Sequence, residues 1–240
     1  SRELAGPLDP LTAANRPDAH CVRCGDCAEA CPTGARELVG RTLTAAELVA
    51  EVLRDAPYHA ETGGGVTFSG GEPLAPANAP FVTACLADLS RRGVHTALDT
   101  CGHVPTDTLL DAATLADLVL WDLKLVDDAA HRRHTGVGVG LIHANLRALA
   151  ARGIPVRVRV PLVPGITDGE DNLAAIGRFV AGLPGRVPVD LLPYHTAARD
   201  KYARLGRDYP LAGIPAHGVE EMGRKAAVLS GFGLDVNCGG

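Results

Sequence analysis

The sequence predicts an α/β protein built around a parallel β-sheet. Short apolar runs rich in β-branched residues alternate with longer stretches of helical period from about residue 44 onward. Glycine-rich and polar turn residues follow these strand candidates one after another. Strands and helices that alternate at this spacing are typical of parallel strands joined by right-handed crossovers. A chain of 240 residues, 46% of them hydrophobic, suffices for one sizeable core and a small appendage.

The individual elements follow from local patterns. Thr44 and Glu47 form a capping box that opens the first helix, whose apolar positions begin at Leu48. The expected strands are 65–69, 94–99, 118–124, 156–163 and 189–194, and 234–237 is a candidate for a last strand. The expected helices between them are 77–92, 106–116, 139–152, 170–183 and 217–230.

Residues suited to ligand binding follow five successive strands. In barrels and in open α/β sheets, ligands bind at the carboxyl ends of the strands. The sequence therefore predicts a binding site along this rim of the sheet. Its members, in chain order, are Gly70, Gly71, Glu72, Asp99, Asp122, Lys124, Pro164, Gly165 and His195.

The polar rim residues each permit a second interpretation. Asp99 and Asp122 are expected near a bound ligand, where two carboxylates would repel unless a cation lay between them. Asp99 could instead cap a helix or form a turn, and Asp122 could pair with Lys124, which points to the same side of the strand. His195 is either a ligand contact or a structural hydrogen-bonding residue. We favour the ligand site because these residues share one rim.

Two further features of the strands are ambiguous. Arg157 and Arg159 alternate with valines, so both side chains face the same side, either into the barrel or against the helices. A buried pair of arginines would need anionic partners. The Gly70-Gly71 turn could be an ordinary connection between strand and helix.

Four of the seven cysteines form a compact run of Cys21, Cys24, Cys27 and Cys31, which Pro32 follows. This spacing is that of bacterial ferredoxins, in which the thiolates hold 4Fe-4S clusters. A zinc site fits poorly, because it needs two pairs of ligands separated by a longer loop. Since the fourth cysteine of such a run ligates the other cluster in two-cluster ferredoxins, Cys31 either closes a single cluster or reaches for a second one.

The composition argues against several classes of protein. The net charge is −5, and no basic run suggests a nucleic-acid partner. No apolar stretch is long enough to span a membrane, and no signal-peptide pattern occurs. We therefore expect a cytoplasmic protein without nucleic-acid or membrane partners. The chain starts at Ser1, and the polar segment 1–20 shows no helix or strand period. We therefore expect that the given sequence begins partway through a longer one.

Seven motifs follow the ferredoxin run in the order found in one enzyme family. They are GGGVTFSGGEP at 63–73, LDTCG at 98–102, LWDLK at 120–124, HTG at 134–136, PLVPG at 161–165, LPYH at 192–195 and Lys201-Tyr202. On these residues the sequence resembles the glycyl radical enzyme activating enzymes of the radical S-adenosylmethionine family, the pyruvate formate-lyase activase type. The resemblance covers almost everything from Cys21 to the end.

The resemblance implies a partial (β/α)6 TIM-like barrel that lacks its first strand, over residues 41–240. It also implies a small ferredoxin-like 4Fe-4S segment over residues 1–40, the second half of a two-cluster insert. The implied reaction is reductive cleavage of S-adenosylmethionine to a 5′-deoxyadenosyl radical, which abstracts hydrogen from a glycine of a partner glycyl radical enzyme. A flavodoxin or ferredoxin is the implied electron donor.

The resemblance also implies a role for each rim residue. The glycine turn, whose backbone can approach an ammonium closely, would lie beside the methionine amino group. Asp99 and Asp122 would hold a monovalent cation, and Lys124 would meet the cofactor carboxylate. The implied cofactor-binding residues are Gly70, Gly71, Glu72, Asp99, Asp122, Lys124, Arg159 and His195, and the implied cluster ligands are Cys21, Cys24, Cys27 and Cys31.

The sequence departs from the family at its start. The CxxxCxxC loop that holds the catalytic cluster is absent from residues 1–20, and the run from Cys21 has a different spacing. We therefore expect an N-terminally truncated activase that is inactive as given, with no catalytic residue present. The alternatives are a ferredoxin-like electron-transfer or iron-sulfur-binding remnant and a zinc-binding α/β domain. Val139 and Ala198 also replace an Asn and a Gly that are usual in the family.

Overall fold

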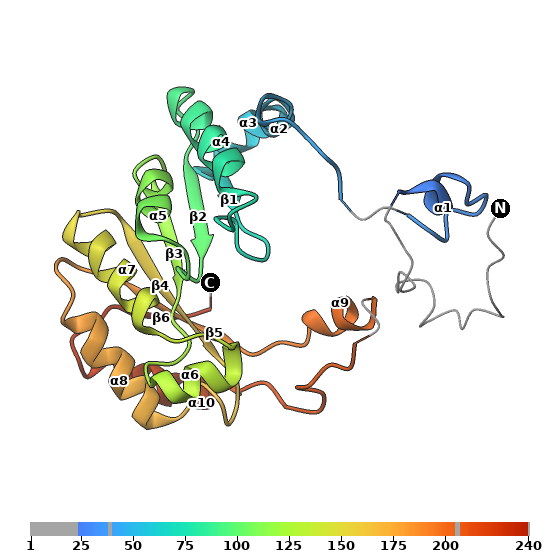
Figure 1. The fold of residues 1–240 in the computed structure, drawn as a ribbon. Coiled ribbons are helices and arrows are strands. Elements are labelled where there is room, and N and C mark those ends of the chain that lie inside the picture. The colour runs from blue at the N-terminus through green and yellow to red at the C-terminus, as the bar shows by residue number, and fades with distance from the viewer. Residues whose placement is uncertain (1–23, 38–39, 205–206, 240) are drawn as a thin grey trace. The chain divides into compact units, whose positions relative to one another are not determined.

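The computed structural model describes residues 24–37, 40–204 and 207–239. These fall into two compact units, one drawn from residues 1–42 and 195–215 and the other from residues 43–194 and 216–240. The second unit contains the whole sheet (Figure 1). Each unit is described by itself below.

The sheet has six strands, all parallel and arranged in chain order from β1 to β6. This confirms the predicted α/β class, and sequential order is the arrangement that βα units of a barrel produce. The strands are β1 Val66–Phe68, β2 Thr96–Thr100, β3 Leu118–Asp122, β4 Val156–Leu162, β5 Val189–Pro193 and β6 Val236–Cys238.

Helices connect the successive strands of this unit, and the helical segments between residues 45 and 62 precede the first strand. The predicted capping box at Thr44 is present, because its hydroxyl accepts from the Glu47 amide while the Glu47 carboxylate accepts from the Thr44 amide. The helices are α2 Ala45–Val52, the 3-10 turn η1 Leu53–Asp55, α3 Ala56–Thr62, α4 Ala79–Arg91, α5 Thr106–Ala113, α6 Asp128–Thr135, α7 Gly140–Ala151, α8 Glu170–Ala181 and α10 Val219–Ser230.

The two faces of the sheet differ in chemistry. Strand register aligns Phe68 with Leu98 and then Val119, and these side chains belong to the buried hydrophobic core together with residues of the helices. Register on the opposite face aligns Asp122 with Arg159 and then Asp190. Figure 1 shows α4, α5, α7 and α8 ranged along one side of the strands. The alternation along each strand therefore separates an apolar face, which packs on helices, from a charged face.

Several element boundaries differ from the predicted ones. The first strand is three residues long, and α3 and α6 were not predicted. α6 escapes detection because it is short and very polar, although Asp127 caps it by accepting from the Ala130 amide at 2.7 Å. Val139 stands at the N-cap of α7, where its apolar side chain cannot accept from the helix, but its own amide donates to Asp128. The unusual residue is thus accommodated through its backbone.

The other unit contains the short helix α1, Asp26–Glu29, and α9, Ala198–Arg204. α1 follows Gly25, which has a left-handed conformation, and lies within the ferredoxin-type run. Among the described residues of the chain, no helix is long and apolar enough to cross a membrane.

Candidate functional site

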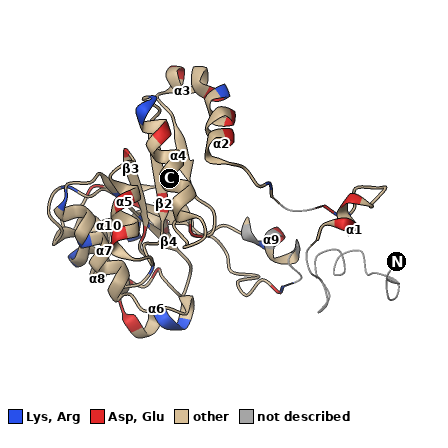
Figure 2. Ribbon diagram, turned by 45° about the horizontal axis from the view of Figure 1, so that its top comes forward, with Lys and Arg blue, Asp and Glu red and all other residues tan. Residues whose placement is uncertain are grey.

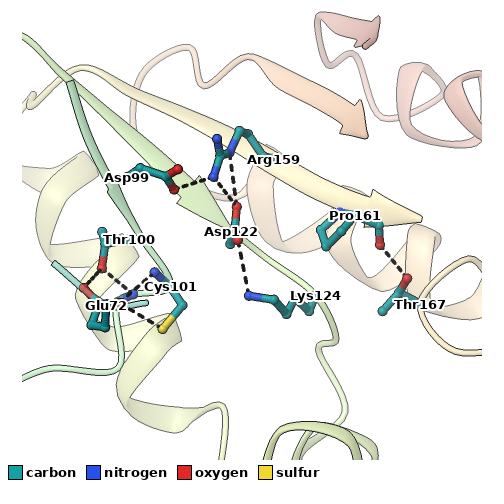
Figure 3. A network of polar contacts seen from close by, with 10 residues as sticks. Glu72, Asp99, Thr100, Cys101, Asp122, Lys124, Arg159, Pro161 and Thr167 are labelled. Carbon is teal, nitrogen blue, oxygen red and sulfur yellow. Dashed lines mark hydrogen bonds and ion pairs between the residues drawn. The ribbon is translucent and has the colours of Figure 1, made fainter. Parts of the chain in front are cut away.

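Four charged side chains, from three neighbouring strands and the loop after β3, meet at the rim of the sheet. The Arg159 guanidinium bridges Asp99 and Asp122, with its Nη2 2.8 Å from Asp122 Oδ1 (Figure 3). Lys124 approaches the same aspartate from the other side, with its Nζ 3.3 Å from Oδ2. The Arg159 guanidinium thus offsets the predicted repulsion between the carboxylates of Asp99 and Asp122. The predicted pairing of Asp122 with Lys124 is also present.

Strand register explains this grouping. Asp122 of β3 is the direct neighbour of Arg159 of β4, so their side chains emerge side by side. Asp99 lies near the end of β2, within reach of the long arginine side chain. Sequence periodicity predicts the face of each residue but not this pairing, because register depends on how separate strands align.

The network is only partly shielded from water, which shapes its electrostatics. Burial raises the pKa of Asp99 above its usual value, Arg159 opposes this shift, and the Asp122 carboxylate adds to it. Burial alone would lower the pKa of Arg159, but the two aspartates raise it. The Arg159 side chain keeps 19% of its accessible surface, so a ligand can still reach the network.

A second polar group joins the loops that follow β1 and β2. The Glu72 carboxylate accepts from the Thr100 hydroxyl at 2.8 Å and from the Cys101 amide at 3.1 Å. Its other two bonds come from the Leu74 amide at 3.2 Å and from the Cys101 thiol at 3.1 Å. Figure 3 shows Glu72 directed at this segment of β2. The structure thus ties the predicted residue Glu72 to the protein backbone.

The glycine turn in front of Glu72 is open to solvent. Ser69, Gly70 and Gly71 are exposed, and Gly70 has a φ of 133°, which strongly favours glycine. A Cβ added at Gly70 or Gly71 would meet no atom within 4 Å. The backbone of this turn is therefore accessible to a ligand.

Two asparagines that the sequence did not single out hold the rim loops. Asn145 of α7 donates to the carbonyl oxygens of Gly102 and Val104 in the loop after β2. Asn172 of α8 donates to the carbonyl oxygen of Lys124 and accepts from the Val126 amide. Each asparagine therefore fixes the loop after an earlier strand. A polar residue inside an amphipathic helix ordinarily indicates a solvent-facing position, so sequence periodicity does not reveal this role.

The loop after β4 is held by a further cluster. Asp168 accepts from the Gly165 amide at 2.7 Å and lies 2.9 Å from His217 Nε2 and 3.3 Å from Lys225 Nζ. Glu221 lies 3.6 Å from the same histidine nitrogen, so three potential metal ligands are close together. The Lys225 ammonium already balances Asp168, which argues against a cation there. Burial alone would raise the pKa of Asp168, but its hydrogen bonds lower it.

The remaining predicted residues belong to the other unit or lie outside the described residues. His195 is exposed, and its Nδ1 accepts from the Ala197 amide at 3.3 Å. Cys24, Cys27 and Cys31 are free thiols, and the hydroxyl of Thr33 helps to lower the pKa of Cys31 to about 7. Cysteine thiolates are the groups that ligate iron-sulfur clusters. Cys21 lies outside the described residues.

The charges of the rim and the charged face suit a cationic ligand that also carries an anionic group. Asp99 and Asp122 supply partly exposed carboxylates, whereas Lys124 and Arg159 supply partly exposed cations. Elsewhere, Lys and Arg are scattered over the described helices without a single-sign run (Figure 2).

Comparison with known proteins agrees with this geometry. The model of the Radical SAM superfamily matches residues 26–175, which is more than half of the chain. The chain belongs to the radical SAM superfamily. This confirms the family resemblance predicted from the rim motifs, and the parallel sheet is the radical SAM fold.

Individual relatives of this radical SAM chain are activating enzymes. It is 44% identical over 160 residues to the isethionate sulfite-lyase activating enzyme of Nitratidesulfovibrio vulgaris, covering 64% of this chain and 51% of that enzyme. It is 39% identical over 161 residues to the pyruvate formate-lyase 2-activating enzyme of Escherichia coli, covering 66% of this chain and 54% of that enzyme. The chain thus spans about half the length of the curated relatives it matches.

Solved structures give the same result. A crystallised domain of a pyruvate-formate lyase-activating enzyme from Bacteroides vulgatus superposes with a TM-score of 0.62 at 30% identity, covering 74% of this chain and 100% of that domain. A radical SAM methyltransferase from Sphaerobacter thermophilus has a TM-score of 0.61 at 21% identity, covering 87% of this chain and 60% of that protein, which supports the fold alone.

Proposed function

We propose that this chain is the S-adenosylmethionine-binding barrel of a glycyl radical enzyme activating enzyme, together with a ferredoxin-type segment. The observation on which the proposal chiefly depends is the rim network of Asp99, Asp122, Lys124 and Arg159, at the carboxyl ends of parallel strands. The similarity to activating enzymes for isethionate sulfite-lyase and pyruvate formate-lyase supports the choice of a glycyl radical enzyme as the partner.

The residues of the rim suit the charges of S-adenosylmethionine, which carries a sulfonium, an ammonium and a carboxylate. In the proposal, backbone carbonyls of the exposed turn at Gly70 and Gly71 accept from the ammonium. Lys124 turns from Asp122 to the ligand carboxylate, a movement that its half-buried position allows. Asp99 and Arg159 orient the ligand from the sheet. His195, which belongs to the other unit, is proposed as a cofactor contact from the family resemblance alone.

A catalytic cluster cannot be assigned to residues of this chain. A 4Fe-4S cluster with S-adenosylmethionine would supply one-electron cleavage of the cofactor and removal of hydrogen from a glycine of the partner. No three of the cysteines have the spacing CxxxCxxC, so no step can be derived through that cluster. We therefore propose that these 240 residues bind the cofactor without cleaving it.

The ferredoxin-type segment has a separate role in the proposal. Cys21, Cys24, Cys27 and Cys31 would ligate a 4Fe-4S cluster that relays electrons. Cys24, Cys27 and Cys31 are free thiols, and cysteine thiolates are the ligands of such clusters. A flavodoxin or ferredoxin is the proposed electron donor. We also propose a cytoplasmic location, because cysteines stay reduced in that compartment.

The proposal also includes a monovalent cation that binds at the rim together with the cofactor. Without ligand, the Arg159 guanidinium bridges Asp99 and Asp122 and supplies the positive charge there. A cation can enter between the carboxylates only when Arg159 turns toward the ligand. We therefore expect potassium or sodium to affect cofactor affinity rather than the stability of the free protein.

Calorimetric titration of the 240-residue chain with S-adenosylmethionine tests the cofactor site. We expect binding that Lys124→Met weakens by about ten-fold, because a charged hydrogen bond is lost. S-adenosylhomocysteine, which lacks the sulfonium charge, should bind more weakly than the cofactor. Absence of binding by a chain that remains folded would refute the cofactor site and favour the iron-sulfur remnant.

Two further measurements separate the remaining alternatives. Anaerobic reconstitution followed by iron, sulfide and zinc analysis distinguishes a cluster from a zinc site at the cysteine run. Reduction in the presence of S-adenosylmethionine should yield no 5′-deoxyadenosine. Steady formation of that product would overturn the proposed inactivity of the 240 residues.

A further inference from the structure

We propose that Glu72 is a positioning residue, which Thr100 and Cys101 anchor so that the exposed turn before it is fixed for the cofactor. This inference refines the proposed function, since the resemblance placed Glu72 among the cofactor contacts. The hydrogen bonds themselves can be tested without any ligand.

The first step of the argument is the saturation of the Glu72 carboxylate. Two donors reach each of its oxygens, the Thr100 hydroxyl and the Leu74 amide at Oε1 and the Cys101 amide and thiol at Oε2. A carboxylate offers about four acceptor positions. The chain therefore uses the whole hydrogen-bonding capacity of this side chain, which leaves none for a ligand ammonium.

The Thr100 and Cys101 side chains are suited to act as donors here. Thr100 is 2% exposed, and its hydroxyl accepts from the Gly102 amide at 2.9 Å while it donates to Glu72. Burial raises the pKa of the Cys101 thiol, and the neighbouring Glu72 adds to this shift. The thiol therefore keeps its proton and donates a hydrogen bond to Glu72. Both hydrogens consequently point toward the carboxylate.

The anchor is itself attached to the core. Gly102 has a φ of 70°, and a Cβ at this position would lie 1.9 Å from the buried ring of Trp121. Asn145 holds the carbonyl oxygen of Gly102 at 2.8 Å. A continuous series of contacts therefore runs from α7 and β3, through the end of β2, to Glu72.

The turn needs this support because its strand is weakly held. β1 has three residues and pairs only with β2 among the described strands. The turn from Ser69 to Gly71 is exposed, and glycine leaves the backbone free to adopt many conformations. Glu72 supplies a connection from this turn to a central part of the sheet. Its carboxylate thus fixes the backbone that would face the cofactor.

Hydrogen exchange of the ligand-free chain tests the anchor directly. The amides of Leu74 and Cys101 donate to Glu72, so their exchange reports on it. We expect Thr100→Val to accelerate their exchange by about ten-fold and Thr100→Ser to preserve the wild-type rate. Cys101→Val and Cys101→Ser form a second pair with the same expectation.

The matched control is Thr96→Val, the same substitution at the opposite end of β2. Thr96 is fully buried and its hydroxyl lies 3.4 Å from Asp117. We expect this variant to leave the exchange of Leu74 unchanged. Equal acceleration by the Thr96 and Thr100 variants, or unchanged exchange in Thr100→Val, would overturn the anchor.

Cofactor titration then tests the positioning role. We expect Glu72→Gln and Thr100→Val each to weaken binding of S-adenosylmethionine by about ten-fold, with rescue by Thr100→Ser. The double variant should bind no more weakly than either single one, because both act through the same anchor. Wild-type binding by Thr100→Val together with a loss in Glu72→Gln would overturn the positioning role. If even the wild-type chain does not bind, the cofactor site fails while the exchange result still decides the anchor.

Discussion

The two faces of the sheet are made by the same strands but are stabilised differently. On one face, Leu98, Trp121 and Val158 are fully buried among helices. On the other, Asp99, Asp122 and Arg159 alternate with them and remain partly exposed. Parallel sheets ordinarily bury both faces under helices and consist of apolar runs. The alternation in this chain separates a face that is buried among helices from a charged face, where we propose that the ligand binds.

This comparison predicts opposite consequences of substitution. A change on the apolar face should lower the free energy of unfolding strongly and affect cofactor affinity only through loss of folded protein. A change on the charged face should lower stability less and affinity more. The following experiments test that division, from the largest expected loss of stability to the smallest.

The largest loss is expected for Trp121→Ala. Trp121 is fully buried and packs against Gly102, so its removal leaves a cavity. Urea denaturation should show a loss of about 3–5 kcal/mol in the free energy of unfolding. The control Leu141→Ala removes a side chain that is 38% exposed, and its effect should stay within about 0.5 kcal/mol. Similar losses in both variants would contradict the assignment of the core face.

Arg159→Met should lower stability by about 2 kcal/mol at pH 7, less than for a fully buried pair because its partners are partly exposed. Removing the guanidinium raises the pKa of Asp99 further, since Arg159 is what lowers it. A carboxyl group whose pKa is higher in the folded than in the unfolded state destabilises the fold at neutral pH, and this destabilisation disappears when the group is protonated at low pH. The deficit of the variant should therefore shrink as the pH falls below about 5.

The matched control for this variant is Arg186→Met. Arg186 also pairs with an aspartate, Asp235, but its side chain is 81% exposed. Removal of the Arg186 guanidinium should lower the free energy of unfolding by about 0.5 kcal/mol or less at every pH from about 4 to about 8, because an exposed ion pair contributes little. A pH-independent deficit in Arg159→Met would contradict the proposed coupling to Asp99.

His143 offers a test of the helical layer by pH. It stacks on Phe179 between α7 and α8, and burial lowers the pKa of His143 to about 4. Because the unfolded chain binds a proton at the ordinary value of about 6.5, stability should fall as the pH falls from about 6.5 to 4. His143→Phe should remove about 1–2 kcal/mol of this fall, allowing for partial exposure. Exposed His134 serves as the control, and its replacement by Phe should leave the profile unchanged.

Asn172→Ala should cost about 1 kcal/mol, because it removes the bonds to the carbonyl oxygens of Lys124 and Thr167. It should also weaken cofactor binding by releasing the backbone of Lys124. The control is Asn78→Ala, since the Asn78 side chain makes no capping bond to α4 in the described structure. Calorimetry in which both alanine variants bind like wild type would exclude the positioning of Lys124 by Asn172.

Lys124→Met should give the smallest change in stability and a clear loss of cofactor affinity. Its ion pair with Asp122 is one-third exposed, so its contribution to unfolding is about 0.5 kcal/mol. Arg91→Met, which removes an exposed pair with Asp88 on α4, should match it in denaturation but bind the cofactor normally. Equal binding by the two variants would break the division between the faces.

The sequence predicted the fold well because apolar periodicity determines which face of each element is buried. The βα alternation, the capping box at Thr44 and the sequential placement of rim residues all depend on local pattern alone. Short polar helices such as α6 lack that pattern and were missed. The sequence therefore predicts whether a segment is a helix or a strand better than it predicts how many helices there are.

The details of the site were less accessible. Arg159 is 60 residues from Asp99, and Asn172 is 48 residues from the Lys124 carbonyl that it holds. Such contacts depend on strand register and on the exact height of each helix, which one sequence does not reveal. The sequence thus identified all four residues of the rim network and offered the pair of Asp122 with Lys124, but it did not reveal the two contacts of Arg159.

The chain-ordered sheet has a consequence for protein engineering. A cut beside Gly136, the exposed residue that follows α6, leaves Asp99 and Asp122 on one fragment and Arg159 on the other. Reassembly of the two halves would then restore a charge balance that neither half has alone. Fragment complementation of such a split protein should for this reason weaken at high salt and respond to S-adenosylmethionine, which would make the divided chain a sensor for this metabolite.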